Sequence, residues 1–125
     1  MHCVQPKRTL STGELQRALE RFDWIVEEVR DLVCGADAGE LGEVLGDEGA
    51  RTSAKERALV TLGLMATARA EAALRWWDST GEHPRVRILH RLANRECSRR
   101  RGAAARAFPQ ASSPKPRARL TQLVR

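Results

Sequence analysis

Aromatic residues are scarce in the 125-residue sequence, which has no tyrosine and only two phenylalanines. The apolar side chains left to form a core are mainly leucine, valine and alanine, with three tryptophans, and such a composition favours helices over sheets. No apolar run approaches the ~20 residues of a membrane-spanning helix, because the best candidate, residues 58–68, lies between Arg57 and Arg69. Residues 1–10 lack the apolar segment of a secretory signal, so the expected location is the cytoplasm.

Cysteine is scarce, with single residues at positions 3, 34 and 97 and no CxxC pair. This pattern predicts neither a disulfide framework nor a zinc site. The three histidines have none of the usual metal-binding spacings. Cys97 and His90 would lie on one helix without a group to stabilise an oxyanion, which argues against nucleophilic catalysis. We therefore expect a protein that is not an enzyme and has no metal or cofactor.

Capping signals and apolar periodicity predict an all-α domain, a three-helix bundle. Ser11 and Glu14 form a capping box before the first helix, and Ser53 and Glu56 form a second one. The expected helices span about residues 12–34, 54–79 and 84–101, with an acidic, glycine-rich loop over 35–52 that holds at most one short helical turn.

The second predicted helix is apolar on nearly all sides, so we expect it either at the centre of the bundle or with an extra face buried against another subunit. The helical domain spans residues 11–102 and follows a flexible N-terminus over residues 1–10. A basic tail spans residues 103–125, although its alanine-rich start, AAARAF, could extend the third helix by a turn or two. The remainder has three prolines within eight residues, a composition typical of disorder.

Charge is segregated along the chain, although the net charge is only +6. Residues 1–50 hold eleven acids and five bases, whereas residues 51–125 hold seventeen bases and five acids. From Arg85 onward there are twelve bases and a single acid, Glu96, a density typical of segments that bind nucleic acid. Arginine outnumbers lysine nineteen to three, which is also typical of GC-rich coding sequence, so part of the excess has a genomic explanation.

Arginines that step by four residues predict a basic stripe on the third helix, opposite its apolar face. Like charges at this spacing repel each other, and a polyanion would relieve the repulsion. Arginine and asparagine side chains also match the edges of guanine and adenine. The predicted nucleic-acid interface comprises Arg87, Arg91, Asn94, Arg95, Arg99, Arg100, Arg101, Lys115, Arg117 and Arg119.

Two other interpretations fit the same arginines. They could form a solvated basic face, or the acids between Asp37 and Glu48 could cover the stripe, within one chain or across a homodimer. Exposed ion pairs of that kind contribute little stability, but together they would mask the basic surface.

The three tryptophans predict a protein interface. Trp24 lies among charged residues on the polar side of the first helix, where an aromatic side chain usually marks a contact surface. The alternatives are that a loop covers it or that it lies along the stems of its charged neighbours. Trp76 and Trp77 point about 100° apart, so we expect one in the core and one at an edge or interface. The favoured hypothesis is a small regulatory or accessory protein that binds nucleic acid. The alternative is a protein-interaction module, such as an adaptor, an inhibitor or an antitoxin-like partner, that uses these tryptophans and the acidic loop.

Overall fold

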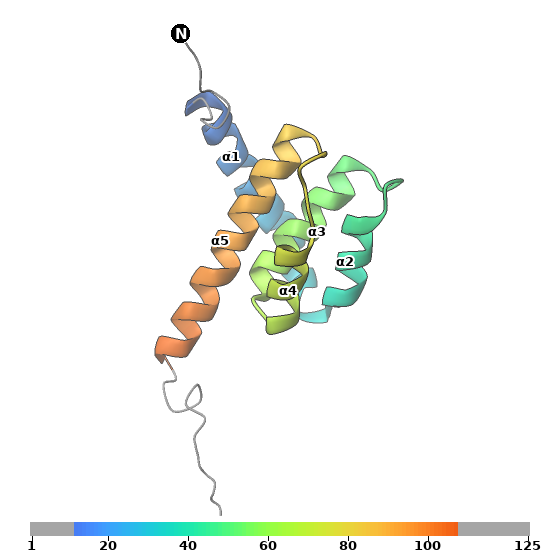
Figure 1. Cartoon of the computed structure of the whole chain (residues 1–125). Helices are drawn as coiled ribbons and strands as arrows, with labels where there is room; N and C mark the ends of the chain where they lie inside the picture. The colour runs from blue at the N-terminus through green and yellow to red at the C-terminus, as the bar shows by residue number, and fades with distance from the viewer. Residues whose placement is uncertain (1–11, 108–125) are drawn as a thin grey trace, which may run out of the picture.

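The computed structural model describes residues 12–107, and all regular secondary structure within them is helical (Figure 1). The all-α prediction is therefore confirmed. No described helix is both long enough and apolar enough to cross a membrane. The elements are α1 (Thr12–Val29), continued by the 3-10 helix η2 (Arg30–Gly35), then α2 (Ala38–Gly46), α3 (Thr52–Met65), α4 (Ala68–Trp76) and α5 (Pro84–Ala107).

The predicted count of three helices is wrong, because the described residues form five α-helices. One of the additional helices, α2, lies inside the segment that was predicted to be a loop. Asp37 caps it by accepting hydrogen bonds from the backbone nitrogens of Gly39 at 2.7 Å and Glu40 at 3.3 Å. Its Leu45 is buried in the core, and α2 packs against α3 and α4. These tertiary contacts override the low helix propensity of the glycines.

The predicted helix over residues 54–79 is also wrong, since it divides into α3 and α4. Ala66 ends α3 in the left-handed conformation, with φ 51° and ψ 38°. The next residue, Thr67, caps α4 by accepting a hydrogen bond from the backbone nitrogen of Ala70 at 3.1 Å. An unbroken helix would carry Leu74 about 13 Å past Met65. The turn instead brings Leu74 back to the core, where it is fully buried.

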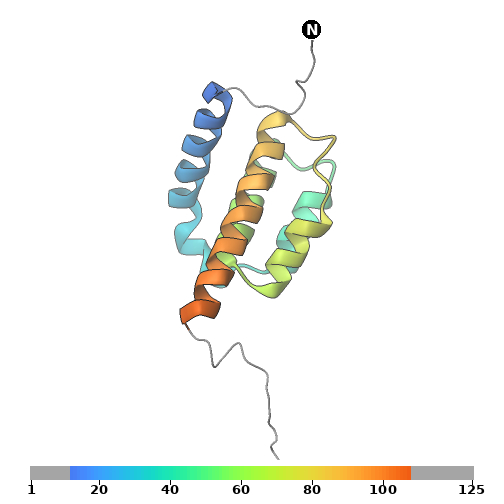
Figure 2. The same cartoon turned by 60° about the vertical axis from the view of Figure 1, so that its left-hand side comes forward.

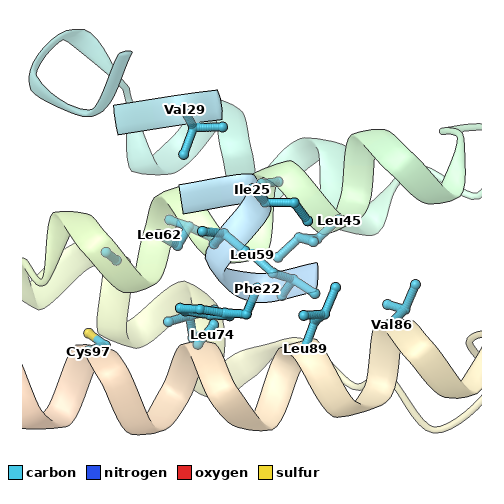
Figure 3. Packing of buried hydrophobic residues seen from close by; sticks show 14 of the residues in the cluster. Phe22, Ile25, Val29, Leu45, Leu59, Leu62, Leu74, Val86, Leu89 and Cys97 are labelled. Carbon is cyan, nitrogen blue, oxygen red and sulfur yellow. The ribbon is translucent and has the colours of Figure 1, made fainter. Parts of the chain in front are cut away.

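Helix α3 is the centre of the bundle, as predicted, and packs against each of the other helices. Leu59 and Leu62 are fully buried between α1 and α5 (Figure 3). Viewed from the side, α5 lies between α1 and α4, in front of α3 (Figure 2). The backbones of α3 and α5 come close at Gly63, where an added Cβ would lie 3.0 Å from the carbonyl oxygen of Ala93.

Helix α5 ends at Ala107, so residues 103–107, at the start of the predicted tail, extend the third helix as the alanine-rich stretch allowed. The alanines of this stretch are strong helix formers, which explains the extension. No described side chain after Cys97 is buried. The predictions for the N-terminus, the cap at Ser11 and the tail residues Lys115, Arg117 and Arg119 lie outside the described residues.

Candidate functional site

The outer face of α5 presents the first half of the predicted stripe to solvent. Arg87, Arg91 and Arg95 are all exposed. Arg87 donates from Nη1 to the carbonyl oxygen of Thr80 at 3.2 Å. Within residues 12–107, none of the three arginines forms an ion pair with a carboxylate. Asn94, half-buried, belongs to the same part of the helix.

The second half of the stripe is partly neutralised by acids. Both Arg99 Nη2 and Arg100 Nε lie 2.5 Å from Oε2 of Glu96, one turn earlier on the same helix. The hydrogen bond from Arg99 lowers the pKa of Glu96 and raises the pKa of Arg99. Arg101 Nε lies 3.2 Å from Oε1 of Glu71 on α4. These three guanidinium groups therefore reach solvent while each is paired with a carboxylate.

The acids that cover part of the stripe are not those of the predicted loop. In the part of the chain that the structure describes, no acid between Asp37 and Glu48 forms an ion pair with an arginine. Asp37 caps α2, and Asp47 accepts a hydrogen bond from the backbone nitrogen of Gly49 at 2.8 Å. The structure thus leaves the acids of α2 on a surface separate from the arginines of α5.

The three tryptophans have different environments. Trp24 is 54% exposed, with the guanidinium carbon of Arg21 at 4.9 Å from its ring centroid. Trp76 is 89% exposed at the end of α4. Trp77 is half-buried, and its ring is inclined by 61° to the ring of His90 at a centroid distance of 5.2 Å. Of the predicted interface residues, Trp24 and Trp76 therefore lie on the surface, whereas Trp77 packs inward.

A buried carboxylate that the sequence analysis missed joins three helices. Glu56 on α3 is fully buried and accepts hydrogen bonds from Arg21 of α1, at 2.9 Å, and from Arg85 of α5. The capping box that was predicted at Ser53 is wrong, because the N-cap of α3 is Arg51 and no side chain caps it. A charged residue in a helix with apolar residues on all sides was the signal that could have revealed this group.

A hollow of about 600 Å³ opens beside this ion pair, between the N-terminal parts of α1 and α5. Its walls carry basic, acidic and apolar side chains together. They include Arg17, Arg21, Trp24, Arg85 and Ile88, with Glu14 and Glu20. Opposite charges in similar number leave the hollow without a clear preference for an anion or a cation.

The residues considered for catalysis have structural contacts. Nδ1 of His90 lies 2.8 Å from Oγ of Ser79, and its Nε2 lies 2.6 Å from the carbonyl oxygen of Leu74. Cys97 is buried in the core, and burial raises the pKa of its thiol. No cluster of three histidine, cysteine or acidic side chains within residues 12–107 is arranged to hold a metal ion.

Comparison of the chain with protein-family models, with curated proteins and with solved structures found no match.

Proposed function

We propose that this protein binds nucleic acid through the outer face of α5. The observation that supports the proposal is the set of three exposed arginines, Arg87, Arg91 and Arg95, without a carboxylate partner in residues 12–107. Their like charges lie one helical turn apart, so they repel each other unless an anion lies between them. A chain of phosphates supplies negative charge at comparable intervals.

The shape of α5 suits this partner. Its 24 residues form a rod of about 36 Å. The major groove of DNA is ~12 Å wide and admits an α-helix. Asn94 has the donor and acceptor pattern that pairs with adenine, while the arginines can contact phosphates or guanine. Arg99 and Arg100 add positive charge towards the C-terminal end of α5. Their exposed ion pairs with Glu96 are weak enough for a phosphate to replace the carboxylate.

The proposal is tested by measuring fluorescence anisotropy of a labelled DNA duplex and a labelled RNA duplex at two salt concentrations. Each phosphate contact contributes ~0.9 to the slope of log K against log salt for B-DNA. We expect the triple variant R87Q/R91Q/R95Q to lose up to ~2.7 of that slope. The matched control R17Q/R30Q/R75Q removes the same charge from α1, η2 and α4 and should retain the arginine stripe. Binding that is absent, independent of salt or weakened equally in both variants would refute the proposal.

A protein-interaction module is the second candidate, and the exposure of Trp24 and Trp76 favours it. Exposed tryptophans are common among the residues that dominate binding energy in protein interfaces. We expect W24A and W76A to keep their helical circular dichroism signal and to lose association measured by sedimentation across a concentration series. A single monomeric species at all concentrations would argue against a homodimer.

A further inference from the structure

A second surface, on the side of α4 that faces α2, is acidic and apolar rather than basic. A hollow of about 370 Å³ lies between these two helices. Gly39, Gly42 and Gly46 recur at steps of three and four residues, so much of the α2 wall is bare backbone, with side chains only from Ala38 and Glu43. On the opposite wall, α4 contributes two alanines and the almost fully exposed Trp76.

The wall of the hollow that α2 forms belongs to an acidic segment of the chain. Residues 31–50 contain six acids and no lysine or arginine. None of these acids forms an ion pair with a described residue, and Glu43 lines the hollow directly. Arg69 is the one basic side chain among the described residues of the lining. An occupant of this surface should therefore be basic and should carry apolar side chains small enough to enter a groove floored by glycine and alanine.

One segment of the chain outside the described residues has this chemistry. Residues 115–125, KPRARLTQLVR, contain four basic residues and no acid. Leu120, Leu123 and Val124 recur at steps of three and one, a spacing that places three apolar side chains on one side of a helical turn.

The segment is also within reach of the groove. Arg101 contacts Glu71, so α5 lies against α4 six residues before it ends at Ala107. In both views, the C-terminal end of α5 lies at the same end of the molecule as the start of α4 (Figures 1 and 2). Those six residues add about 9 Å of helix, and crossing α4 requires about 10–12 Å. Residues 108–114, if extended, span up to ~25 Å.

We infer that residues 115–125 dock in the groove between α2 and α4 of the same chain. The leucines and Val124 enter the apolar hollow beside Trp76, and the basic side chains face the acids of α2. The inference is independent of nucleic-acid binding, because it concerns a different surface. It nevertheless gives Lys115, Arg117 and Arg119 two competing anionic partners, the acids of α2 and an external phosphate chain.

Zero-length carbodiimide coupling of the full chain tests this inference. The reagent joins a lysine amine to a contacting carboxylate as an amide, with water removed by the reagent. The sequence has only three lysines, at positions 7, 55 and 115. Lys55 Nζ lies 3.1 Å from Glu82, so a Lys55–Glu82 product serves as the internal control for folding. Docking predicts a product that joins Lys115 to Glu40, Glu43 or Asp47, identified by mass spectrometry after digestion.

A mixture of ¹⁴N-labelled and ¹⁵N-labelled chains distinguishes coupling within one chain from coupling between chains. We expect the Lys115 product to contain a single isotope. Products of mixed isotope, or a Lys115 product spread over acids of other helices, would overturn the inference.

Two leucine substitutions, one inside the groove and one outside it, serve as the test variant and its matched control. An added Cβ at Gly46 or at Gly35 meets no atom within 4 Å, so a side chain can start at both positions without a clash at its Cβ. G46L projects into the groove and should abolish the Lys115 product, whereas G35L, on η2, should retain it. L123D removes an apolar contact without altering the described domain and should also abolish the product. Unchanged coupling in G46L and L123D, with the Lys55–Glu82 product intact, would refute docking.

Discussion

Arg21 of α1 and Glu56 of α3 form an ion pair of 2.9 Å in which the carboxylate is fully buried. Arg85 of α5 binds the same carboxylate, so one acid holds three helices together. Both arginines reach solvent, with side-chain exposures of 30% and 46%. The arrangement lets the carboxylate lose its water because two guanidinium groups replace the lost hydrogen bonds.

Replacing this carboxylate should destabilise the fold. We expect E56Q to lower the free energy of unfolding by about 2–3 kcal/mol, since hydrogen bonds to a charged group are lost while both arginines can still be hydrated. Urea denaturation followed by circular dichroism measures the change. The control E20Q, at an exposed position of α1, should stay within ~0.5 kcal/mol of the parent. Equal stability of E56Q and the parent would show that the buried pair contributes nothing.

The close packing at Gly63 predicts that alanine, although a better helix former than glycine, destabilises the fold at this position. A Cβ at this position would lie 3.0 Å from the carbonyl oxygen of Ala93 and 3.2 Å from its Cα. Overpacking outweighs the gain in helix propensity, so G63A should lose about 1–2 kcal/mol. G46A, where the added Cβ meets nothing within 4 Å, should be neutral or gain up to ~1 kcal/mol. Denaturant midpoints of the two variants that shift equally would contradict this account of the α3–α5 contact.

The turn between α3 and α4 offers a stabilising substitution. Ala66 has φ 51°, a conformation that glycine adopts without the steric cost of a Cβ. After allowance for the greater freedom of glycine in the unfolded chain, A66G should gain about 0.5–1 kcal/mol. The same change at Ala70, inside α4, should lose ~1 kcal/mol. Thermal and urea unfolding of both variants distinguish the two environments, and a loss of stability in A66G would be inconsistent with the left-handed turn.

The sequence pattern was sufficient for the helical class, and the apolar residues on all sides of α3 indicated either a central position or a subunit interface, of which the structure shows the central position. It was insufficient at Ala66 and at α2. Thr67, a preferred N-cap residue, is the one local signal of a break after Ala66, and the break itself depends on Leu74 reaching the core. Helix α2 depends in the same way on contacts with distant helices, which no local propensity reports.

In the candidate site, the sequence predicted the arrangement of residues along α5 but not the contact between α5 and α4. The spacing of Arg87, Arg91 and Arg95 follows from helix geometry, and their exposure agrees with it. Glu96 lies three and four residues before Arg99 and Arg100, so their pairing was readable from the sequence. The contact between Arg101 and Glu71 was not, because it joins two helices whose packing is set by the whole core.

The pairing at the end of the stripe makes Glu96 a pH-sensitive group. Its pKa is lowered, chiefly by the hydrogen bond from Arg99. A carboxylate with a lowered folded-state pKa stabilises the fold above its unfolded pKa, and that contribution is lost as the pH falls through the folded value. Side-chain carbon NMR should therefore show a titration midpoint for Glu96 below that of an ordinary glutamate. R99Q should move the midpoint upward, whereas R91Q should leave it almost unchanged, and equal midpoints in both variants would rule out the pairing.

Paired and unpaired arginines should contribute differently to binding if α5 contacts nucleic acid as proposed. Arg95 has no carboxylate partner in residues 12–107, whereas Arg100 lies 2.5 Å from Glu96. We expect R95Q to reduce the salt slope of duplex binding by ~0.9, the value for one phosphate contact, and R100Q to reduce it by less. E96Q removes the competing carboxylate, so it should strengthen binding at low salt and steepen the slope. Fluorescence anisotropy at four or more salt concentrations gives these slopes. If R100Q weakens binding more than R95Q, or if E96Q weakens it, the intrahelical ion pairs do not compete with phosphate, and the distinction between the two halves of the stripe has no functional meaning.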